Sequence, residues 1–250
     1  MTAPYDPLIA MQGGGAPLVF VPGMDGTGRL FHRQVPLLAT RYRVATYTLR
    51  DEADRMDVLV ADLARVIRAV TPGEAPAVVV GESFGGAVAM SLALTHPELV
   101  RALVVLNSFP RFLPQFRLQL AIAALRLVPW QTMPLVRRLT AFRLHSRHTH
   151  RTEIRRFLEV TRETRRHGYL ARLRILQQYD VRERLGALRM PTLFLASELD
   201  HLVPSVREGR YMAERVPGAT LRVLTGHGHI CMIAPDFDLE RLLHDWRPDL

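Results

Sequence analysis

A serine flanked by glycines is the sharpest chemical feature of this sequence. Residues 81–85 read Gly-Glu-Ser-Phe-Gly, directly after the apolar run 77–80 and before a helical pattern over 87–94. A strand-to-helix turn this tight lifts the hydroxyl of Ser83 clear of the backbone, next to helix N–H groups that can stabilise an oxyanion. Glycine fits beside the serine at 81 and 85, and Gly86 lets the helix pack closely on the sheet. The pattern therefore predicts a nucleophilic serine.

An acid able to support this serine follows a later strand. A serine hydroxyl is a poor nucleophile unless a base takes its proton and an acid orients that base. The apolar run 192–195 predicts a strand, and Asp200 follows it shortly before Val-Pro. A carboxylate at the carboxyl end of a strand suits the orienting role, so Asp200 is the predicted acid. Glu198 in the same loop is the alternative.

Two histidines compete for the role of base. The residues 226–229 read Gly-His-Gly-His and come directly after the last predicted strand. The Gly-x-Gly-His pattern before the apolar run 230–234 favours His229, and His227 is the alternative. A histidine flanked by glycines at a strand end is typical of a functional loop.

The first clear strand ends in a glycine-rich loop that can supply backbone donors. Residues 21–28 read Val-Pro-Gly-Met-Asp-Gly-Thr-Gly, and their glycines let the backbone approach a substrate oxygen. We expect the N–H groups of Met24 and Phe84 to form the oxyanion hole, while the role of Asp25 stays open. The loop lacks the Gly-Lys-Ser/Thr of a phosphate-binding loop and the spacing of a dinucleotide site. No cofactor is therefore expected.

The remaining pattern predicts an α/β fold with a mostly parallel sheet and helices on both faces. Short continuous apolar runs alternate with longer helical patterns, as in buried parallel strands joined by helical crossovers. Functional groups in such sheets gather at the carboxyl ends of the strands. The expected strands are 17–22, 42–47, 77–80, 103–106, 192–195 and 220–224, and the expected helices are 57–70, 87–94, 206–216 and 236–246.

A basic helical segment interrupts this alternation. Residues 108–190 hold 18 arginines against five acidic residues, and the sequence has no lysine. We expect this segment to form a helical, Arg-rich cap inserted in a core made of residues 1–107 and 191–250. Its first helix, 116–128, is apolar on nearly all sides, so it is buried or faces an apolar ligand. Three aromatic residues at the start of the cap are predicted to line the pocket entrance: Phe109, Phe112 and Phe116.

Composition excludes several other classes of protein. The chain has 250 residues, a net charge of +9, 48% hydrophobic residues and one cysteine, Cys231, which excludes a disulfide scaffold and a disordered chain. No secretory signal or membrane span is legible, so a cytoplasmic location is expected. No nucleic-acid motif accompanies the arginines, and the cluster 145–150 lacks the cysteines or acids of a metal site. Surface contact with anionic lipid and the oligomeric state stay open.

Together these residues resemble the small capped serine enzymes of the α/β-hydrolase superfamily. The resemblance covers nearly the whole chain through 81–86, Asp200, His229 and the predicted cap. It departs at residues 22–23, where Pro-Gly replaces the common His-Gly, and at 48–54, which lack the usual Asp-x-x-Gly-x-Gly-x-Ser. The loop at 22–28 is similar to that of bacterial hydrolases related to plant acyl-ester synthases and to thioesterases.

The resemblance implies acyl transfer through a covalent intermediate on Ser83. His229 takes the serine proton, Asp200 holds the imidazole in its tautomer, and water attacks the acyl-enzyme. A carboxylic-ester hydrolase acting on a small-molecule ester or acyl substrate is the first hypothesis. A thioesterase or acyltransferase is the second, because Arg side chains in the cap can hold the phosphates of coenzyme A or an acyl carrier. A non-catalytic ligand-binding protein is the third.

Overall fold

A computed structural model describes residues 9–71, 75–112 and 144–250, together with residues 73, 123, 130–132 and 135. Phe116 and nearly all of the helix expected at 116–128 lie outside the described residues.

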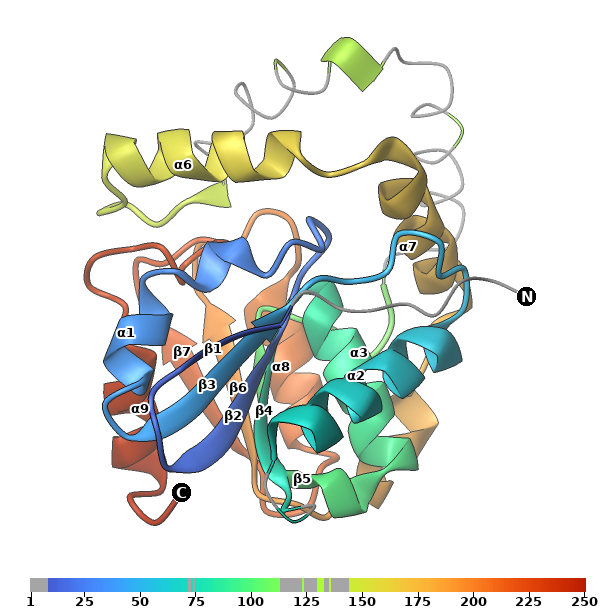
Figure 1. Cartoon of the computed structure of the whole chain (residues 1–250), viewed down its shortest axis with the longest axis vertical. Coiled ribbons are helices and arrows are strands. Elements are labelled where there is room, and N and C mark those ends of the chain that lie inside the picture. Colours follow the sequence, from blue (N-terminus) through green and yellow to red (C-terminus); the bar gives the residue numbers. More distant parts are fainter. Residues whose placement is uncertain are drawn as a thin grey trace.

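The described residues form a seven-stranded sheet in the order β1-β3-β2-β4-β5-β6-β7 (Figure 1). The first strand pairs antiparallel with its neighbour, and every other pairing is parallel. Strands β4 and β6 are buried along their whole length, which explains their mostly apolar sequences. The strands are β1 (Ile9–Gln12), β2 (Ala16–Val21), β3 (Tyr42–Tyr47), β4 (Ala77–Glu82), β5 (Val100–Leu106), β6 (Thr192–Ser197) and β7 (Thr220–Leu224).

Helices cover both faces of the sheet (Figure 1). The helices α2 (Met56–Val70), α3 (Phe84–Thr95) and α8 (Ser205–Ala213) pack on one face, and α1 (Gln34–Leu38) and α9 (Leu239–Trp246) pack on the other. Side chains alternate between these layers: in β2, Val19 points to the α2 and α3 side and Phe20 to the α1 and α9 side. This two-sided burial is what the α/β prediction requires.

Two further helices lie between β5 and β6 in the chain. These are α6 (Arg151–Arg162) and α7 (Arg166–Gln178). They contact loops that follow β2 and β3, so they lie over the carboxyl ends of the strands (Figure 1). Both fall within the segment predicted as a helical insert, while its boundaries as a cap stay a prediction. Among the described residues, no helix is long and apolar enough to cross a membrane.

The predicted mostly parallel sheet is confirmed. Strands β3 and β7 have the expected bounds, β2 is shifted by one residue, and β4, β5 and β6 extend the expected runs by two or three residues. Two elements were not expected, the edge strand β1 and the short helix α1. Three helix boundaries were also wrong. Helix α3 begins at Phe84 rather than at 87. The last helix begins at Leu239 rather than at 236, because the Asp238 side chain accepts a hydrogen bond from the N–H of Arg241 and caps the helix there. Helix α8 ends at Ala213 rather than at 216.

Close backbone contact between β2 and α3 yields a test of the fold. A Cβ at Gly85 would lie 2.1 Å from the Val21 carbonyl oxygen, so Gly85→Ala must push α3 away from β2. We expect this substitution to lower the free energy of unfolding by about 1–3 kcal/mol or more, measured by urea denaturation. Gly186→Ala is the matched control, because its Cβ would meet only the Arg215 carbonyl oxygen at 3.7 Å. Equal midpoints for the two variants would contradict this packing.

Candidate functional site

The turn between β4 and α3 holds Ser83 in a strained backbone conformation. Ser83 has φ 55° and ψ −119°, a region that residues with a side chain rarely adopt. Its N–H donates to the Leu106 carbonyl at 2.9 Å, and its carbonyl accepts from the Ser108 hydroxyl at 2.7 Å. Gly86 leaves space for the Ser108 side chain, since a Cβ on residue 86 would lie 2.5 Å from Ser108 Cβ. The strain is thus held by contacts to the neighbouring strand β5.

The structure brings Ser83, His229 and Asp200 into one hydrogen-bonded chain. His229 Nε2 lies 3.0 Å from Ser83 Oγ, and His229 Nδ1 lies 2.7 Å from Asp200 Oδ2. The imidazole side chain is 5% exposed and the carboxylate is fully buried. With Nδ1–H donating to Asp200, Nε2 is left to accept the serine hydroxyl proton. The arrangement can therefore deprotonate Ser83.

Asp200 is held by the loop that follows β6. Its Oδ1 accepts from the N–H groups of Leu202 and Val203, both at 2.9 Å, and its Oδ2 also accepts from the Ser205 hydroxyl. Burial opposes the charged form of Asp200, but the hydrogen bond and charge of His229 and these other donors outweigh it, so the pKa of the carboxyl is lowered. Asp200 is thus an ionised, fixed acceptor for the imidazole.

The two alternative residues have other partners. The exposed Glu198 accepts from the Gly226 N–H at 3.0 Å. His227 Nδ1 lies 2.9 Å from the hydroxyl of Ser146, in the segment that precedes α6. Both contacts hold the loop that carries His229, and neither joins Ser83.

The charge of Asp200 also raises the pKa of His229. Burial lowers the pKa of the imidazole, but the Asp200 hydrogen bond and the Asp200 and Glu82 charges outweigh that effect and raise it above its usual value. Glu82, the residue before the serine, is buried, and burial raises the pKa of its carboxyl to about 7. Its Oε1 finds no hydrogen-bond partner among the described residues. Glu82 was not singled out from the sequence, because the motif allows any residue there.

The glycine-rich loop after β2 lies against the serine turn. A Cβ placed on Gly23 would be 3.9 Å from Ser83 Cβ, so Met24 follows a point of close approach. Phe84 begins α3, and the first N–H groups of a helix have no partner within it. Asp25 fixes the loop by accepting from the N–H of Thr27 at 2.9 Å and from its hydroxyl. The oxyanion-hole roles of Met24 and Phe84 stay a prediction.

Asn107 is a positioning residue that the sequence did not reveal. It has φ 49°, and its side chain joins the end of β6 to the loop after β7. Its Oδ1 accepts from the Ser197 N–H at 2.8 Å, and its Nδ2 donates to the His229 carbonyl at 2.7 Å. The only signal was a polar residue directly after a buried strand.

Of the three aromatic residues predicted to bind substrate, the structure describes Phe109 and Phe112. Phe109 is 2% exposed, and its ring lies 4.6 Å from that of the half-buried Phe112. The ring of Tyr179 meets Phe109 edge-on at 6.4 Å. The structure thus packs Phe109 in the core beside the end of α7. Phe116 lies outside the described residues, and a substrate role for these residues stays a prediction.

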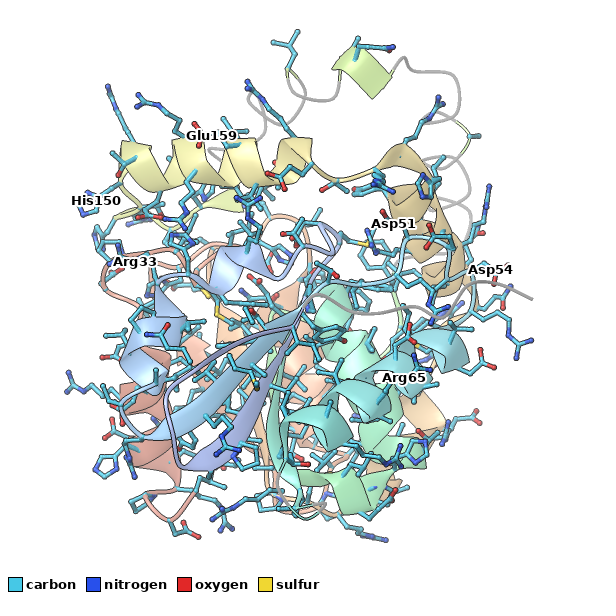
Figure 2. All side chains as sticks on the ribbon, in the orientation of Figure 1. Arg33, Asp51, Asp54, Arg65, His150 and Glu159 are labelled. Atoms are coloured by element: carbon cyan, nitrogen blue, oxygen red, sulfur yellow. The ribbon has the colours of Figure 1, made fainter. Side chains whose placement is uncertain are left out.

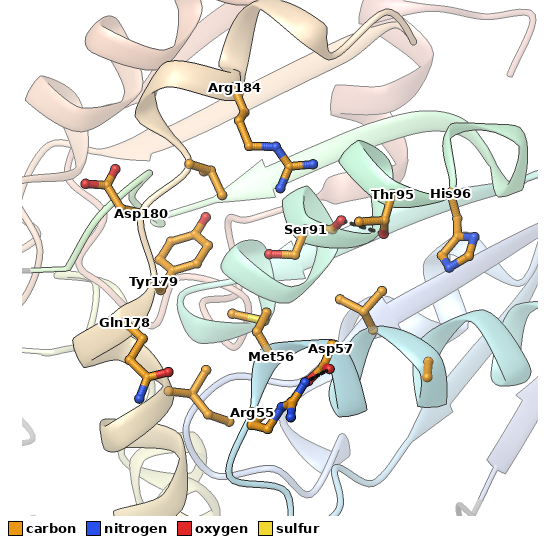
Figure 3. A pocket seen from close by; sticks show the side chains of 14 residues that line it. Arg55, Met56, Asp57, Ser91, Thr95, His96, Gln178, Tyr179, Asp180 and Arg184 are labelled. Carbon is orange, nitrogen blue, oxygen red and sulfur yellow. Dashed lines mark hydrogen bonds and ion pairs between the residues drawn. The ribbon is translucent and has the colours of Figure 1, made fainter.

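A separate cavity of about 550 Å³ opens between α2, α3 and the end of α7 (Figure 3). Its lining includes Ser91 and Thr95 from the second half of α3, and Tyr179 from the residues after α7. The residues that line this cavity do not include Ser83, His229 or Asp200.

Known proteins resemble this chain in sequence and in structure. The model of a family described as "alpha/beta hydrolase fold" matches residues 16–234. A protein named "Putative carbamate hydrolase RutD" from Azorhizobium caulinodans is 30% identical over 93% of this chain and 92% of its own. A pimeloyl-[acyl-carrier protein] methyl ester esterase from Aeromonas hydrophila is 28% identical, covering 89% and 91% of the two chains. A thermophilic esterase from Thermogutta terrifontis superposes with a TM-score of 0.85, at 21% identity over 96% and 92% of the two chains.

The pKa of His229 tests the geometry of this site. Replacing Asp200 with Asn removes the charge that raises this pKa, while burial continues to lower it. The Asn oxygen stays with the Leu202 and Val203 N–H groups, so its NH2 takes the place of Oδ2 and accepts nothing from His229 Nδ1. We therefore expect the pKa of His229 to fall in Asp200→Asn, measured by NMR titration of the imidazole and assigned with His229→Asn. Glu198→Gln is the control and should leave the value unchanged. A pKa that followed Glu198 instead of Asp200 would contradict the hydrogen-bonded chain described above.

Proposed function

Because the chain belongs to the alpha/beta hydrolase fold family, we propose that it cleaves a carboxylic ester through an acyl-enzyme on Ser83. One observation carries the proposal: Ser83 Oγ, His229 and Asp200 are joined by hydrogen bonds of 3.0 and 2.7 Å at a strained serine. Hydrolase activity also agrees with the names of its relatives.

The first half of the proposed reaction forms the acyl-enzyme. Ser83 Oγ attacks the ester carbonyl carbon while His229 Nε2 takes the hydroxyl proton. The carbonyl oxygen becomes an oxyanion, which the N–H groups of Met24 and Phe84 stabilise. The intermediate collapses, the bond to the alcohol oxygen breaks, and the imidazolium gives its proton to the leaving alkoxide.

The second half releases the acid. His229 takes a proton from water as the water oxygen attacks the acyl carbon, and the same donors stabilise the second oxyanion. Collapse returns the proton to Ser83 Oγ and frees the carboxylic acid. Asp200 gives up no proton: it keeps Nδ1 protonated and stabilises the imidazolium in both halves.

A second candidate substrate is an acyl group carried on coenzyme A or on an acidic carrier protein. Helix α6 exposes four arginines, and Arg155 and Arg156 among them form no ion pair with the described residues. Exposed guanidinium groups suit phosphates and carboxylates. The Aeromonas relative is named for an ester on an acyl-carrier protein.

Ester hydrolysis tests the first candidate. We expect the protein to hydrolyse p-nitrophenyl esters, assayed across acyl lengths, and Ser83→Ala to lower kcat by about 10³-fold or more, because the nucleophile is lost. Ser91→Ala, on the same helix, is the control. A fluorophosphonate probe should label the parent and leave Ser83→Ala unlabelled. Turnover that survived in Ser83→Ala would overturn the mechanism, and a parent that failed to label would favour a ligand-binding protein.

Arginines on α6 test the second candidate. If a carrier is bound there, replacing Arg155 and Arg156 with Gln should lower kcat/KM for an acyl-coenzyme A by about 10-fold, about 1.4 kcal/mol of lost binding. The same change should leave p-nitrophenyl ester hydrolysis within about twofold. Arg241→Gln, on the exposed side of α9, is the matched control. Equal effects on both substrates would exclude a carrier-specific role.

A further inference from the structure

One arginine of α7 is fully buried against the loop that carries Met24. The side chain of Arg172 is 1% exposed. Its Nη1 donates to the Met24 carbonyl at 3.2 Å, while its Nη2 donates to Asp51 Oδ1 at 2.8 Å and to the Leu49 carbonyl at 3.4 Å. Figure 2 shows Asp51 beside α7. The guanidinium thus joins α7 to the loops that follow β2 and β3.

Two glycines leave the space that this contact needs. Gly26 has φ +73°, and a Cβ there would lie 2.3 Å from Arg172 Nη2. A Cβ on Gly168 would lie 2.0 Å from Asp51 Oδ1. The loop thus packs its backbone directly under the guanidinium, and α7 packs directly on the carboxylate. A side chain at either glycine would displace one of the charged partners.

The loop is also closed on itself beneath Arg172. The N–H of Gly26 donates to the Gly23 carbonyl at 3.1 Å, which makes a turn with Met24 as its second residue. The Gly26 carbonyl accepts from the Leu49 N–H at 2.8 Å. One carbonyl of the turn, that of Met24, then has Arg172 as its donor.

A second contact from the same segment reaches the next peptide. The hydroxyl of Thr164, between α6 and α7, donates to the Asp25 carbonyl at 3.3 Å. Consecutive carbonyls of the loop are therefore held by the residues between β5 and β6. Because each peptide is planar, the Met24 and Asp25 carbonyls fix the two peptides that flank Asp25. The peptide that carries the Met24 N–H is fixed at its Gly23 carbonyl by the Gly26 N–H, so Met24 lies between two held peptides.

We propose that Arg172 is a positioning residue, which holds the Met24 N–H at the orientation that the oxyanion requires. The inference rests on the proposed function, in which Met24 stabilises the oxyanion. A buried charge without its partner is costly, so Arg172 and Asp51 keep this geometry in the free protein. A donor fixed before substrate arrives needs no reorganisation during the reaction.

Kinetics of Arg172 variants test the proposal. We expect Arg172→Met, which keeps the apolar stem and loses the donors, to lower kcat on a p-nitrophenyl ester by about 10- to 100-fold. KM should change by less than about threefold, because ground-state binding does not use the oxyanion donors. Binding of a trifluoromethyl ketone, which mimics the oxyanion, should weaken in parallel with kcat. Arg174→Met, an exposed arginine on the same helix, is the matched control and should keep the parent values.

Chemical rescue separates positioning from general damage to the fold. In Arg172→Ala, guanidinium ion at millimolar concentration should restore part of kcat, whereas urea at the same concentration should not. If the Arg172 variants fail to fold, Thr164→Val removes the other contact to the loop and should lower kcat in the same sense. Folded Arg172→Met with parent kcat and parent inhibitor affinity would overturn the proposal.

Hydrogen exchange distinguishes failure of this inference from failure of the proposed function. Amides of residues 23–27 should exchange faster in Arg172→Met than in the parent or in Arg174→Met, whether or not any ester is turned over. Faster exchange in a protein that a fluorophosphonate does not label would mean that the loop contact exists and the ester mechanism is wrong. Unchanged exchange with a labelled, active parent would mean that the mechanism stands and Arg172 does not position the loop.

Discussion

The φ of 55° at Ser83 is the constraint on which the remaining site depends. A residue with a side chain holds this conformation only if its surroundings fix it. Here β5 and the residues after it fix it through hydrogen bonds to Ser83. Close backbone packing adds to this, since a Cβ on Gly81 in β4 would lie 2.4 Å from the Gly85 carbonyl oxygen and one on Gly85 would reach β2. The hydroxyl therefore has one location, and every other functional group must be brought to it.

The parallel sheet supplies those groups because its strands end at the same edge. The loops after β2, β4, β6 and β7 carry Met24, Ser83, Asp200 and His229 respectively. Asn107, directly after β5, adds hydrogen bonds that join the last residue of β6 to the loop that carries His229. Each residue lies far from the others in sequence, so the register of the sheet, rather than local structure, sets their distances.

The sequence predicted the parts of this site that have a local signature. The serine turn could be predicted because a strand, the flanking glycines and a helix follow one another within a few residues. The pattern at the strand ends favoured Asp200 and His229 and left Glu198 and His227 as alternatives. The hydrogen bonds now separate the two pairs, since the alternatives have other partners. The edge strand β1 was missed because its residues are mostly exposed and lack a buried apolar run.

Asn107 and Arg172 show why the other residues that hold the site in place could not be predicted from the sequence. An asparagine after a strand has no motif, and its role depends on Ser197 and His229, which lie 90 and 122 residues further along the chain. Arg172 is one of 18 arginines in a basic segment, and its neighbour Arg174 is exposed on the same helix. Only the fold separates a guanidinium that is buried against Asp51 from those that face solvent.

The contrast between the buried Arg172 and the exposed arginines explains how α7 is joined to the sheet and its loops. Exposed arginines contribute little to stability, because water screens their charge. Arg172, in contrast, must have Asp51 and the loop carbonyls beside it, since an unpaired buried charge is costly. Helix α7 therefore cannot move away from the loops after β2 and β3 without exposing that charge or separating it from its partners. The placement of α7 over the sheet and the position of the Met24 carbonyl consequently depend on the same guanidinium, that of Arg172.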